Sequence, residues 1–122
     1  LMRTVRKAAP LSLTFVCISS LRDLADVISA DPGLVVDKVR EVAIQGGLDW
    51  DEEANDFVPD SSVNNSFDME GAAAVYHFCF QRGVPMSVVS RNAVPMLPMQ
   101  LAKSFAVRSH CPVMTYLADA QF

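Results

Sequence analysis

Several sequence features that would indicate a function are missing from this chain. Its five glycines are scattered, and none of them forms the GxGxxG or phosphate-loop spacing that marks common nucleotide-binding sites. No apolar run reaches the roughly 20 residues that a membrane-spanning helix needs, and no segment repeats or is of low complexity. Acidic residues outnumber basic ones, and the net charge of −4 disfavours nucleic acid as a partner. We therefore expect neither a membrane span nor a nucleic-acid-binding surface.

Cysteine and histidine are also scarce. The three cysteines, Cys17, Cys79 and Cys111, are odd in number and stand among apolar neighbours, which favours buried thiols over a disulfide framework. This usage favours a reducing intracellular compartment over secretion. Neither His77 nor His110 has a second histidine at ligand spacing, which disfavours a zinc site. A nucleophilic pair of Cys111 with His110 is an alternative, but adjacent residues rarely adopt the geometry that such a pair needs.

Apolar residues, by contrast, are abundant. They make up 51% of the 122 residues, and the mean hydropathy of +0.23 is high for a chain of single-domain length. A small domain buries a smaller fraction of its surface than a large one. We therefore expect part of the surface to be covered, either by a protein partner or by the remainder of the chain's own domain. The expected members of the shared core are Phe15, Val42, Ile44, Phe80 and Val88.

The order of apolar segments predicts an α/β fold. Leu21, Leu24 and Ile28 recur at helical spacing, and the segment that contains them lies between two runs rich in β-forming residues. A strand–helix–strand order indicates a right-handed parallel crossover, and hence a mainly parallel sheet flanked by helices. Asp68 is a good N-cap for a long apolar helix that Gly83 ends. The expected strands are 11–18, 39–47 and 86–90, and the expected helices are 1–9, 21–28, 68–82, 99–107 and 112–120.

The stretch 39–47 and the polar segment that follows it, 48–67, are the expected location of a site. The segment shows no clear periodicity, so we expect a long loop, which in a compact domain is commonly functional. In open α/β sheets, ligands bind beyond the carboxyl ends of the strands. Asp49, Asp51 and Glu53 have the spacing of a calcium loop, but the glycine and the final glutamate of an EF-hand are absent, so a solvated acidic loop is the favoured interpretation.

Three short motifs stand at the ends of these elements. They are Ser19-Ser20-Leu21-Arg22-Asp23, Gln45-Gly46-Gly47 and Asp68-Met69-Glu70-Gly71-Ala72. Together with their flanks, they resemble the central part of the inosine-uridine preferring nucleoside hydrolase family. In that family, a turn of Gly-Leu-Thr-Asn type, a Met-Gly-Gly strand end and an Asp-Pro-Glu-Ala-Ala helix start occur in this order. The resemblance covers most of the chain, with each motif partly altered.

The resemblance implies cleavage of the N-glycosidic bond of a ribonucleoside by a calcium-bound water. The backbone carbonyl of Ile18 falls at the position of the family's central calcium ligand. The Asp-rich strand end would lie before Leu1, and the remaining aspartate and the catalytic histidine would lie after Phe122, so the calcium site is incomplete within this sequence. We therefore expect no catalytic residues and no bound cofactor here, and at best a vestigial metal contact at Ile18.

The resemblance also implies a partial ribose clamp. Asn64 falls on the family's second clamp asparagine and Asp56 on its first, with Asn55 adjacent and able to substitute for it. Gln45 stands where the family has a pocket-lining methionine. Ser62 stands where the family has a clamp glutamate, so a charged acceptor is lost. The substrate-binding residues implied are therefore Asn64, Asp56, Asn55 and Gln45.

These observations predict a partial nucleoside hydrolase-like fold in which residues 1–122 form one segment of an incomplete domain. One hypothesis is an enzyme whose calcium site is completed by other parts of a longer chain, with this segment not catalytic by itself. The alternative is a pseudoenzyme, a non-catalytic structural or binding subunit of a larger assembly. The expected ligand is a ribonucleoside. We also expect contact with a protein partner or with the remainder of the chain's own domain.

Overall fold

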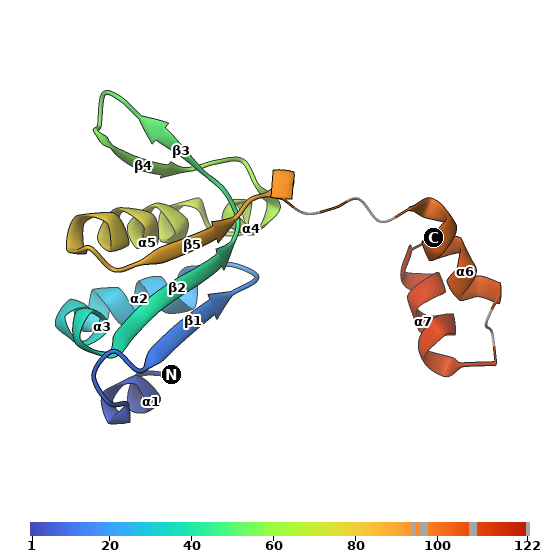
Figure 1. The fold of residues 1–122 in the computed structure, drawn as a ribbon, viewed down its shortest axis with the longest axis horizontal. Coiled ribbons are helices and arrows are strands. Elements are labelled where there is room, and N and C mark those ends of the chain that lie inside the picture. Colours follow the sequence, from blue (N-terminus) through green and yellow to red (C-terminus); the bar gives the residue numbers. More distant parts are fainter. Residues whose placement is uncertain (94, 96–97, 108–109, 122) are drawn as a thin grey trace.

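The computed structural model describes residues 1–93, 95, 98–107 and 110–121, and a three-stranded parallel sheet forms its centre. The strands lie in the order β1 (Leu13–Cys17), β2 (Val39–Gln45) and β5 (Met86–Val89), so β2 is the middle strand (Figure 1). Both pairings are parallel, with Val42 of β2 opposite Phe15 of β1 and Met86 of β5. The predicted α/β class with a parallel sheet is confirmed.

The connection from β1 to β2 consists of two helices, α2 (Arg22–Ala30) and α3 (Pro32–Lys38). Asp31 lies between the two helices, as the C-cap of α2 and the N-cap of α3. Its side chain stabilises the start of α3 by accepting a hydrogen bond from the Leu34 backbone N–H at 3.1 Å, and Pro32 is suited to the first helical turn. The predicted helical face is confirmed, since Leu21, Leu24, Ala25 and Ile28 are all buried. The short helix α1 (Met2–Lys7) precedes β1 and buries Val5.

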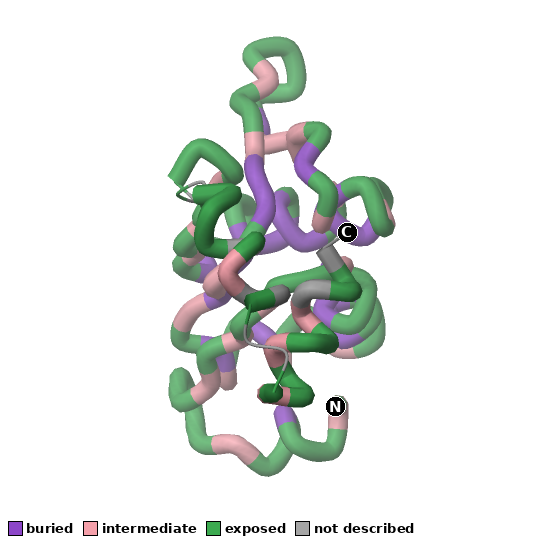
Figure 2. The backbone as a smooth tube through the Cα atoms, turned by 90° about the vertical axis from the view of Figure 1, so that its right-hand side faces the viewer, coloured by how far each residue is buried: buried purple, intermediate pink, exposed green. Residues whose placement is uncertain are grey.

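The hydrophobic core lies between the sheet and the helices α2, α3 and α5 (Met69–Arg82). Figure 2 shows that buried positions gather in the interior of this body. Val42 and Ile44 belong to the core, and Phe15 and Val88 pack against it, as expected. Phe80 is 38% exposed and contacts Trp50 of the hairpin. Its place in a core shared with a partner or with the remainder of the domain stays a prediction.

The segment 48–67 is not the irregular loop that its polarity predicted. It contains an antiparallel hairpin of β3 (Leu48–Asp51) and β4 (Asp56–Pro59), followed by the short helix α4 (Val63–Ser66). The hairpin turn depends on Asp51, whose carboxylate accepts hydrogen bonds from the backbone N–H groups of Glu53 at 2.9 Å and Ala54 at 3.0 Å. Strands of four residues are too short to show a clear alternation, so the pattern did not reveal them.

Helix α5 packs on two sides. Asp68 caps its start by accepting a hydrogen bond from the Gly71 N–H at 3.1 Å, and Gly83, with a φ of 65°, ends it as predicted. One side of the helix faces α2 and the core. On another side, Phe80 meets the hairpin, where the rings of Trp50, Phe57 and Phe80 contact one another edge to face at centroid distances of 5.0 to 5.7 Å.

The chain ends in a short 3₁₀ turn, η1 (Arg91–Ala93), and two helices, α6 (Met99–Val107) and α7 (Pro112–Gln121). The two helices pack against each other, and Figure 1 shows them to one side of the sheet. The connection between η1 and α6 lies partly outside the described residues. None of the helices in the described part of the chain is long and apolar enough to span a membrane.

Candidate functional site

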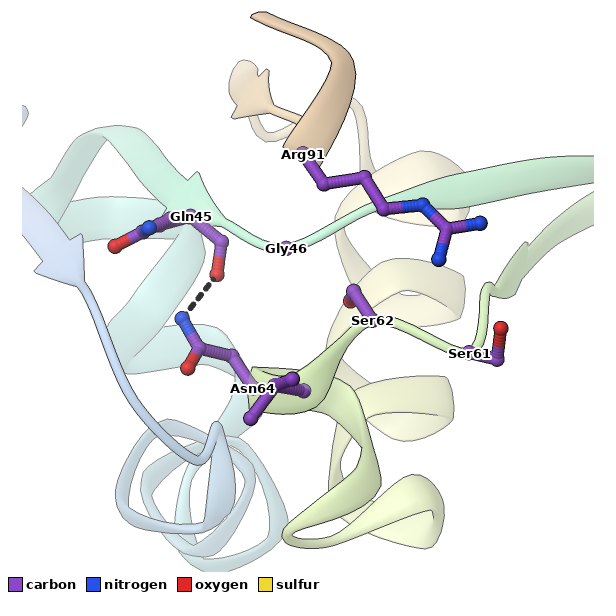
Figure 3. A pocket seen from close by; sticks show the side chains of 7 residues that line it. Gln45, Gly46, Ser61, Ser62, Asn64 and Arg91 are labelled. Atoms are coloured by element: carbon purple, nitrogen blue, oxygen red, sulfur yellow. Dashed lines mark hydrogen bonds between the residues drawn. The ribbon is translucent and has the colours of Figure 1, made fainter. Parts of the chain in front are cut away.

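A pocket lies at the carboxyl edge of the sheet, where β2 and β5 end. Its volume is about 330 Å³. Because parallel strands end at the same edge, residues from distant segments of the sequence meet there. Figure 3 shows the pocket bounded by the end of β2 on one side and by the start of α4 on the other. The residues that line it are Gln45, Gly46, Ser61, Ser62, Val63, Asn64 and Arg91.

Two of the predicted site residues, Asn64 and Gln45, meet in this pocket. The Asn64 side chain donates a hydrogen bond from Nδ2 to the Gln45 backbone carbonyl at 2.8 Å (Figure 3). This bond fixes the Asn64 amide, and its Oδ1 has no other hydrogen-bond partner among the described residues. The Gln45 side chain is exposed at the same edge. The pocket therefore presents amide donors and acceptors, which suit the hydroxyl groups of a sugar.

The floor of the pocket is held by Asn65, which sequence reasoning missed. Asn65 is only 1% exposed, and its Nδ2 bonds the Gly47 carbonyl at 2.7 Å, with the backbone and side-chain oxygens of Asp60 at 3.2 and 3.1 Å. Its Oδ1 accepts a hydrogen bond from the Tyr76 hydroxyl at 3.3 Å. One buried amide therefore joins the end of β2, the segment before α4, and α5.

The absence of side chains at Gly46 and Gly47 allows Tyr76 and Asp60 to approach the end of β2 closely. A Cβ atom added at Gly46 would lie 2.8 Å from the Tyr76 hydroxyl, and one added at Gly47 would overlap the Asp60 carboxylate. The Gly-Gly sequence therefore does more than end the strand, since any side chain would separate β2 from the hydrogen-bonded network below the pocket.

Asp60 supplies a negative charge next to the pocket. Burial raises the pKa of Asp60, but hydrogen bonds from Ser62 and Asn65, together with the charge of Arg91, outweigh burial and hold that pKa below its ordinary value. Its carboxylate accepts a hydrogen bond from the Ser62 backbone N–H at 2.8 Å. The Ser62 hydroxyl is itself buried, and it has no hydrogen-bond partner in the part of the chain that the structure describes.

Arg91 brings the only positive charge among the residues that line the pocket. It begins η1, two residues after the last residue of β5, and its side chain extends over the Ser61 and Ser62 side of the cavity (Figure 3). Within the described ranges, its guanidinium has neither a hydrogen-bond nor an ion-pair partner. Sequence reasoning missed Arg91, although the rule that ligands bind beyond strand ends applies to β5 as it does to β2.

Asp56 and Asn55, by contrast, are not brought to the pocket. Asp56 begins β4 and pairs with Nδ1 of His77 on α5. The hydrogen bond with His77 holds the pKa of Asp56 below its ordinary value, against the effect of burial. Asn55 occupies the hairpin turn with a φ of 50°, a conformation that asparagine tolerates better than most residues. Their implied role in a ribose clamp therefore has no counterpart among the residues that line the cavity.

The described residues do not fit a calcium ion. Ile18 lies one residue beyond β1, at the same edge of the sheet as Gln45, so its carbonyl is suitably placed. A calcium site needs six to eight oxygen ligands, several of them carboxylates. Among the residues that the structure describes, however, no three His, Cys, Asp or Glu side chains come close enough to hold a metal. This covers the acidic residues of the hairpin, including Asp49, Asp51 and Glu53.

The cysteines are free thiols in protected surroundings. Cys79 is buried, and Cys17 and Cys111 are half-buried. Burial raises the pKa of Cys79 to about 12, and burial together with Asp23 raises that of Cys17. A thiol with a raised pKa is a poor nucleophile, because the thiolate is the reactive form. These two cysteines therefore belong to the packing of the molecule.

Comparison with known proteins identifies the fold. No protein-family model and no curated protein sequence matches the chain. Several solved structures match it, and two of them are each aligned over 98% of this chain. The type III effector protein XopQ, complexed with adenosine diphosphate ribose, is 26% identical with a TM-score of 0.74. The effector protein XOO4466 is 28% identical with a TM-score of 0.77.

The fold is nucleoside hydrolase-like. The chain spans 34% of the length of each of the two structures, so it corresponds to about a third of those proteins. The predicted fold class, a partial nucleoside hydrolase-like fold, is therefore confirmed.

Proposed function

We propose that this chain is one segment of a nucleoside hydrolase-like domain that binds a ribose-containing ligand at the β2 edge without cleaving it. The observation that carries the proposal is the fixed amide of Asn64, which the Gln45 carbonyl holds at 2.8 Å within the pocket. An oriented acceptor at Oδ1 and the nearby Gln45 amide suit the adjacent hydroxyls of a ribose, which act as both donors and acceptors.

A neighbouring structure supports this ligand class. XopQ was solved with adenosine diphosphate ribose bound, and that ligand contains ribose. At 26% identity, and with this chain covering 34% of XopQ, the ligand of XopQ is a guide to the chemistry to be tested here. A ribonucleoside or a ribonucleoside derivative is accordingly the ligand that we propose.

The proposal excludes hydrolysis by this chain alone. Attack by a metal-bound water needs an ion held by several carboxylates, and the described residues do not gather such a set. The second candidate function is an enzyme in which residues outside 1–122 complete the calcium site around Ile18. That candidate is favoured only by the position of Ile18 at the same sheet edge as the pocket.

Isothermal titration of the chain with adenosine and with adenosine diphosphate ribose tests the binding proposal. Asn64→Ala should weaken binding by roughly tenfold, because it removes the side-chain amide that would bond a ribose hydroxyl, a hydrogen bond worth about 1 kcal/mol. Asn55→Gly is the matched control, since glycine keeps the turn conformation and the position lies outside the pocket. Absence of binding, or equal affinities in wild type and Asn64→Ala, would contradict the proposal.

The catalytic part is tested separately by assaying ribose release from inosine and uridine with calcium present. We expect no turnover above the blank. Turnover that scales with protein concentration and survives repurification would favour the enzyme hypothesis instead.

A further inference from the structure

A second cavity lies at the amino edge of the sheet, on the side away from the pocket at the carboxyl edge. Its volume is about 490 Å³. It is formed by the turn before β1, by α3 and by the end of α5. The two large apolar side chains that line it, Leu11 and Val36, are 59% and 42% exposed. We call this cavity the amino-edge groove, and its lining residues are Pro10, Leu11, Pro32, Gly33, Val36, Asp37 and Arg82.

Leu11 adopts a backbone conformation that is unusual for its residue type. Its φ of 49° lies in the left-handed region, which favours glycine and disfavours a bulky side chain. The turn is fixed around it, because the Leu11 N–H donates a hydrogen bond to the Asp37 carbonyl at 2.9 Å, and the Ser12 hydroxyl donates one to the Ala9 carbonyl at 2.7 Å. One position thus combines a strained backbone with an exposed leucine. Strain that the surrounding structure maintains commonly occurs at functional sites.

The amino-edge groove has a positively charged border. Arg82 lines the groove and has neither a hydrogen-bond nor an ion-pair partner within the described residues. Asp37, the one acidic residue of the lining, is paired with Lys38 at 2.8 Å. The exposed Arg6 and Lys7 belong to the last turn of α1, shortly before the turn that lines the groove. A complementary occupant therefore carries an apolar side chain next to carboxylates.

The turn of the β3–β4 hairpin has this complementary chemistry. Trp50 is 45% exposed, and the exposed Glu52 and Glu53 follow it closely in the sequence. Residues 48–59 include no basic residue, and neither glutamate has an ion-pair partner in the part of the chain that the structure describes. Figure 1 shows the hairpin at the top, above α5, whereas α1 and α3 lie at the bottom. The hairpin of one molecule therefore lies away from its own groove, but a second copy can bring its hairpin there.

We propose that the amino-edge groove binds the hairpin turn of a second copy of this chain, head to tail. The exposed part of the Trp50 ring would pack on Leu11, and the two glutamates of the turn would face Arg82. Because the groove and the hairpin are different surfaces, the contact is heterologous, and each molecule can bind one neighbour through each surface. This association does not depend on ligand binding at the carboxyl edge.

Sedimentation equilibrium of two complementary variants tests the proposal. Leu11→Gly/Arg82→Gln impairs the groove and keeps the hairpin, and Glu52→Lys/Glu53→Lys reverses the charge of the hairpin turn and keeps the groove. All chains carry Val16→Lys as a common background, so that association through the open face of the sheet, where Val16 is 69% exposed, does not contribute. The background chain should self-associate, and each double variant alone should do so at least roughly tenfold more weakly.

An equimolar mixture of the two double variants distinguishes a head-to-tail contact from other kinds of association. The intact groove of one variant and the intact hairpin of the other should form one-to-one pairs that grow no further, and added salt should weaken these pairs. A mixture that stays monomeric would overturn the proposal. A background chain that is monomeric, or whose association neither double variant weakens, would overturn it as well.

Asp26→Lys/Glu70→Lys is the matched control for the hairpin variant. It changes the net charge by the same amount, at exposed positions outside the groove and the hairpin. This control should associate as the background chain does. If it loses association to the same extent as Glu52→Lys/Glu53→Lys, net charge alone governs the association, and the assignment of the hairpin turn is wrong.

The single variant Leu11→Gly separates binding from folding. Glycine adopts the left-handed conformation without strain, so the thermal midpoint should stay unchanged or rise, while self-association weakens. A variant that loses stability and keeps its association would show that Leu11 serves the packing of its own molecule, and would contradict its role in the groove.

Discussion

Asn64 and Asn65 are adjacent in the sequence, yet the structure gives them different roles. Asn64 is half-exposed at the rim of the pocket and makes one hydrogen bond, to Gln45. Asn65 is buried below the pocket and bonds Gly47, Asp60 and Tyr76. At the scale of residues, ligand contact and structural support are therefore separated by a single position on α4.

This separation predicts opposite effects of two alanine substitutions. Asn65→Ala should lower the free energy of unfolding by about 2–4 kcal/mol, because it removes a buried amide that bonds Gly47, Asp60 and Tyr76 and leaves a small cavity in its place. Asn64→Ala should lower it by about 1 kcal/mol or less, since solvent can replace its single bond. Urea denaturation of both variants provides the measurement. Equal losses of stability would contradict the assignment of Asn65 as the support.

The pair of Asp56 with His77 predicts a pH dependence. The hydrogen bond with His77 places the folded-state pKa of Asp56 below its ordinary value of 3.8. A group whose pKa is lowered on folding stabilises the protein above its unfolded pKa, and this contribution is lost as the pH falls through the folded pKa. Stability should therefore decrease below about pH 4, and His77→Ala should flatten that decrease.

The midpoint of urea denaturation, measured in wild type and His77→Ala from about pH 2.5 to about pH 7, would check this pH dependence. The range extends on both sides of the ordinary carboxyl pKa. Asp68, whose pKa is lowered first by the hydrogen bond with Arg22, contributes an acid dependence that His77→Ala leaves in place. An unchanged profile in His77→Ala would show that the pair does not stabilise the folded state.

At the scale of elements, the β3–β4 hairpin is held against α5 by aromatic contacts. Trp50 and Phe57 belong to the hairpin, and Phe80 belongs to the helix. Trp50 is the only tryptophan in the chain, so its fluorescence reports on the position of the hairpin.

Phe80→Ala should therefore shift the Trp50 emission to longer wavelength and lower the free energy of unfolding by about 1–2 kcal/mol, because it removes edge-to-face contacts and partly buried apolar area. Phe67→Ala is a suitable control, since Phe67 is 63% exposed. An unchanged emission maximum in Phe80→Ala would mean that the hairpin is positioned by other contacts, such as the pair of Asp56 with His77.

At the scale of the whole molecule, one face and two edges of the sheet are left uncovered by the residues that the structure describes. Val16, Ala43 and Ser87 lie side by side on the face opposite the core, and Val16 is 69% exposed. Ile18 is equally exposed, and Val89 is 49% exposed. β1 and β5 are the edge strands, and exposed apolar edges tend to pair with other chains. The expectation that a partner or the remainder of its own domain covers this chain remains a prediction.

We predict that the isolated chain self-associates, and that Val16→Lys reduces the association by placing a charge on the open face. Size-exclusion chromatography with light scattering would measure both. A stable monomer of 13.3 kDa that melts cooperatively would contradict the prediction and would show that this segment folds without help.

The sequence by itself determined the elements whose signals are local. The face of α2, the cap at Asp68 and the stop at Gly83 depend on residues within a few positions of one another, and all three were correctly predicted. The resemblance to nucleoside hydrolases gave the fold class, and the strand-end rule gave the edge at which the pocket lies. Among the site residues, Gln45 and Asn64 were named from the sequence and do meet there.

Only the tertiary structure decided what depends on contacts between distant segments. The pairing of Asp56 with His77, the support given by Asn65 and the approach of Arg91 to Ser62 each join parts of the chain that show no pattern in common. The same holds for the hairpin, whose four-residue strands are stabilised by packing on α5. The physical reason is that hydrogen bonds and packing across α4, α5 and β5 place these side chains, and such contacts leave no periodicity in the sequence.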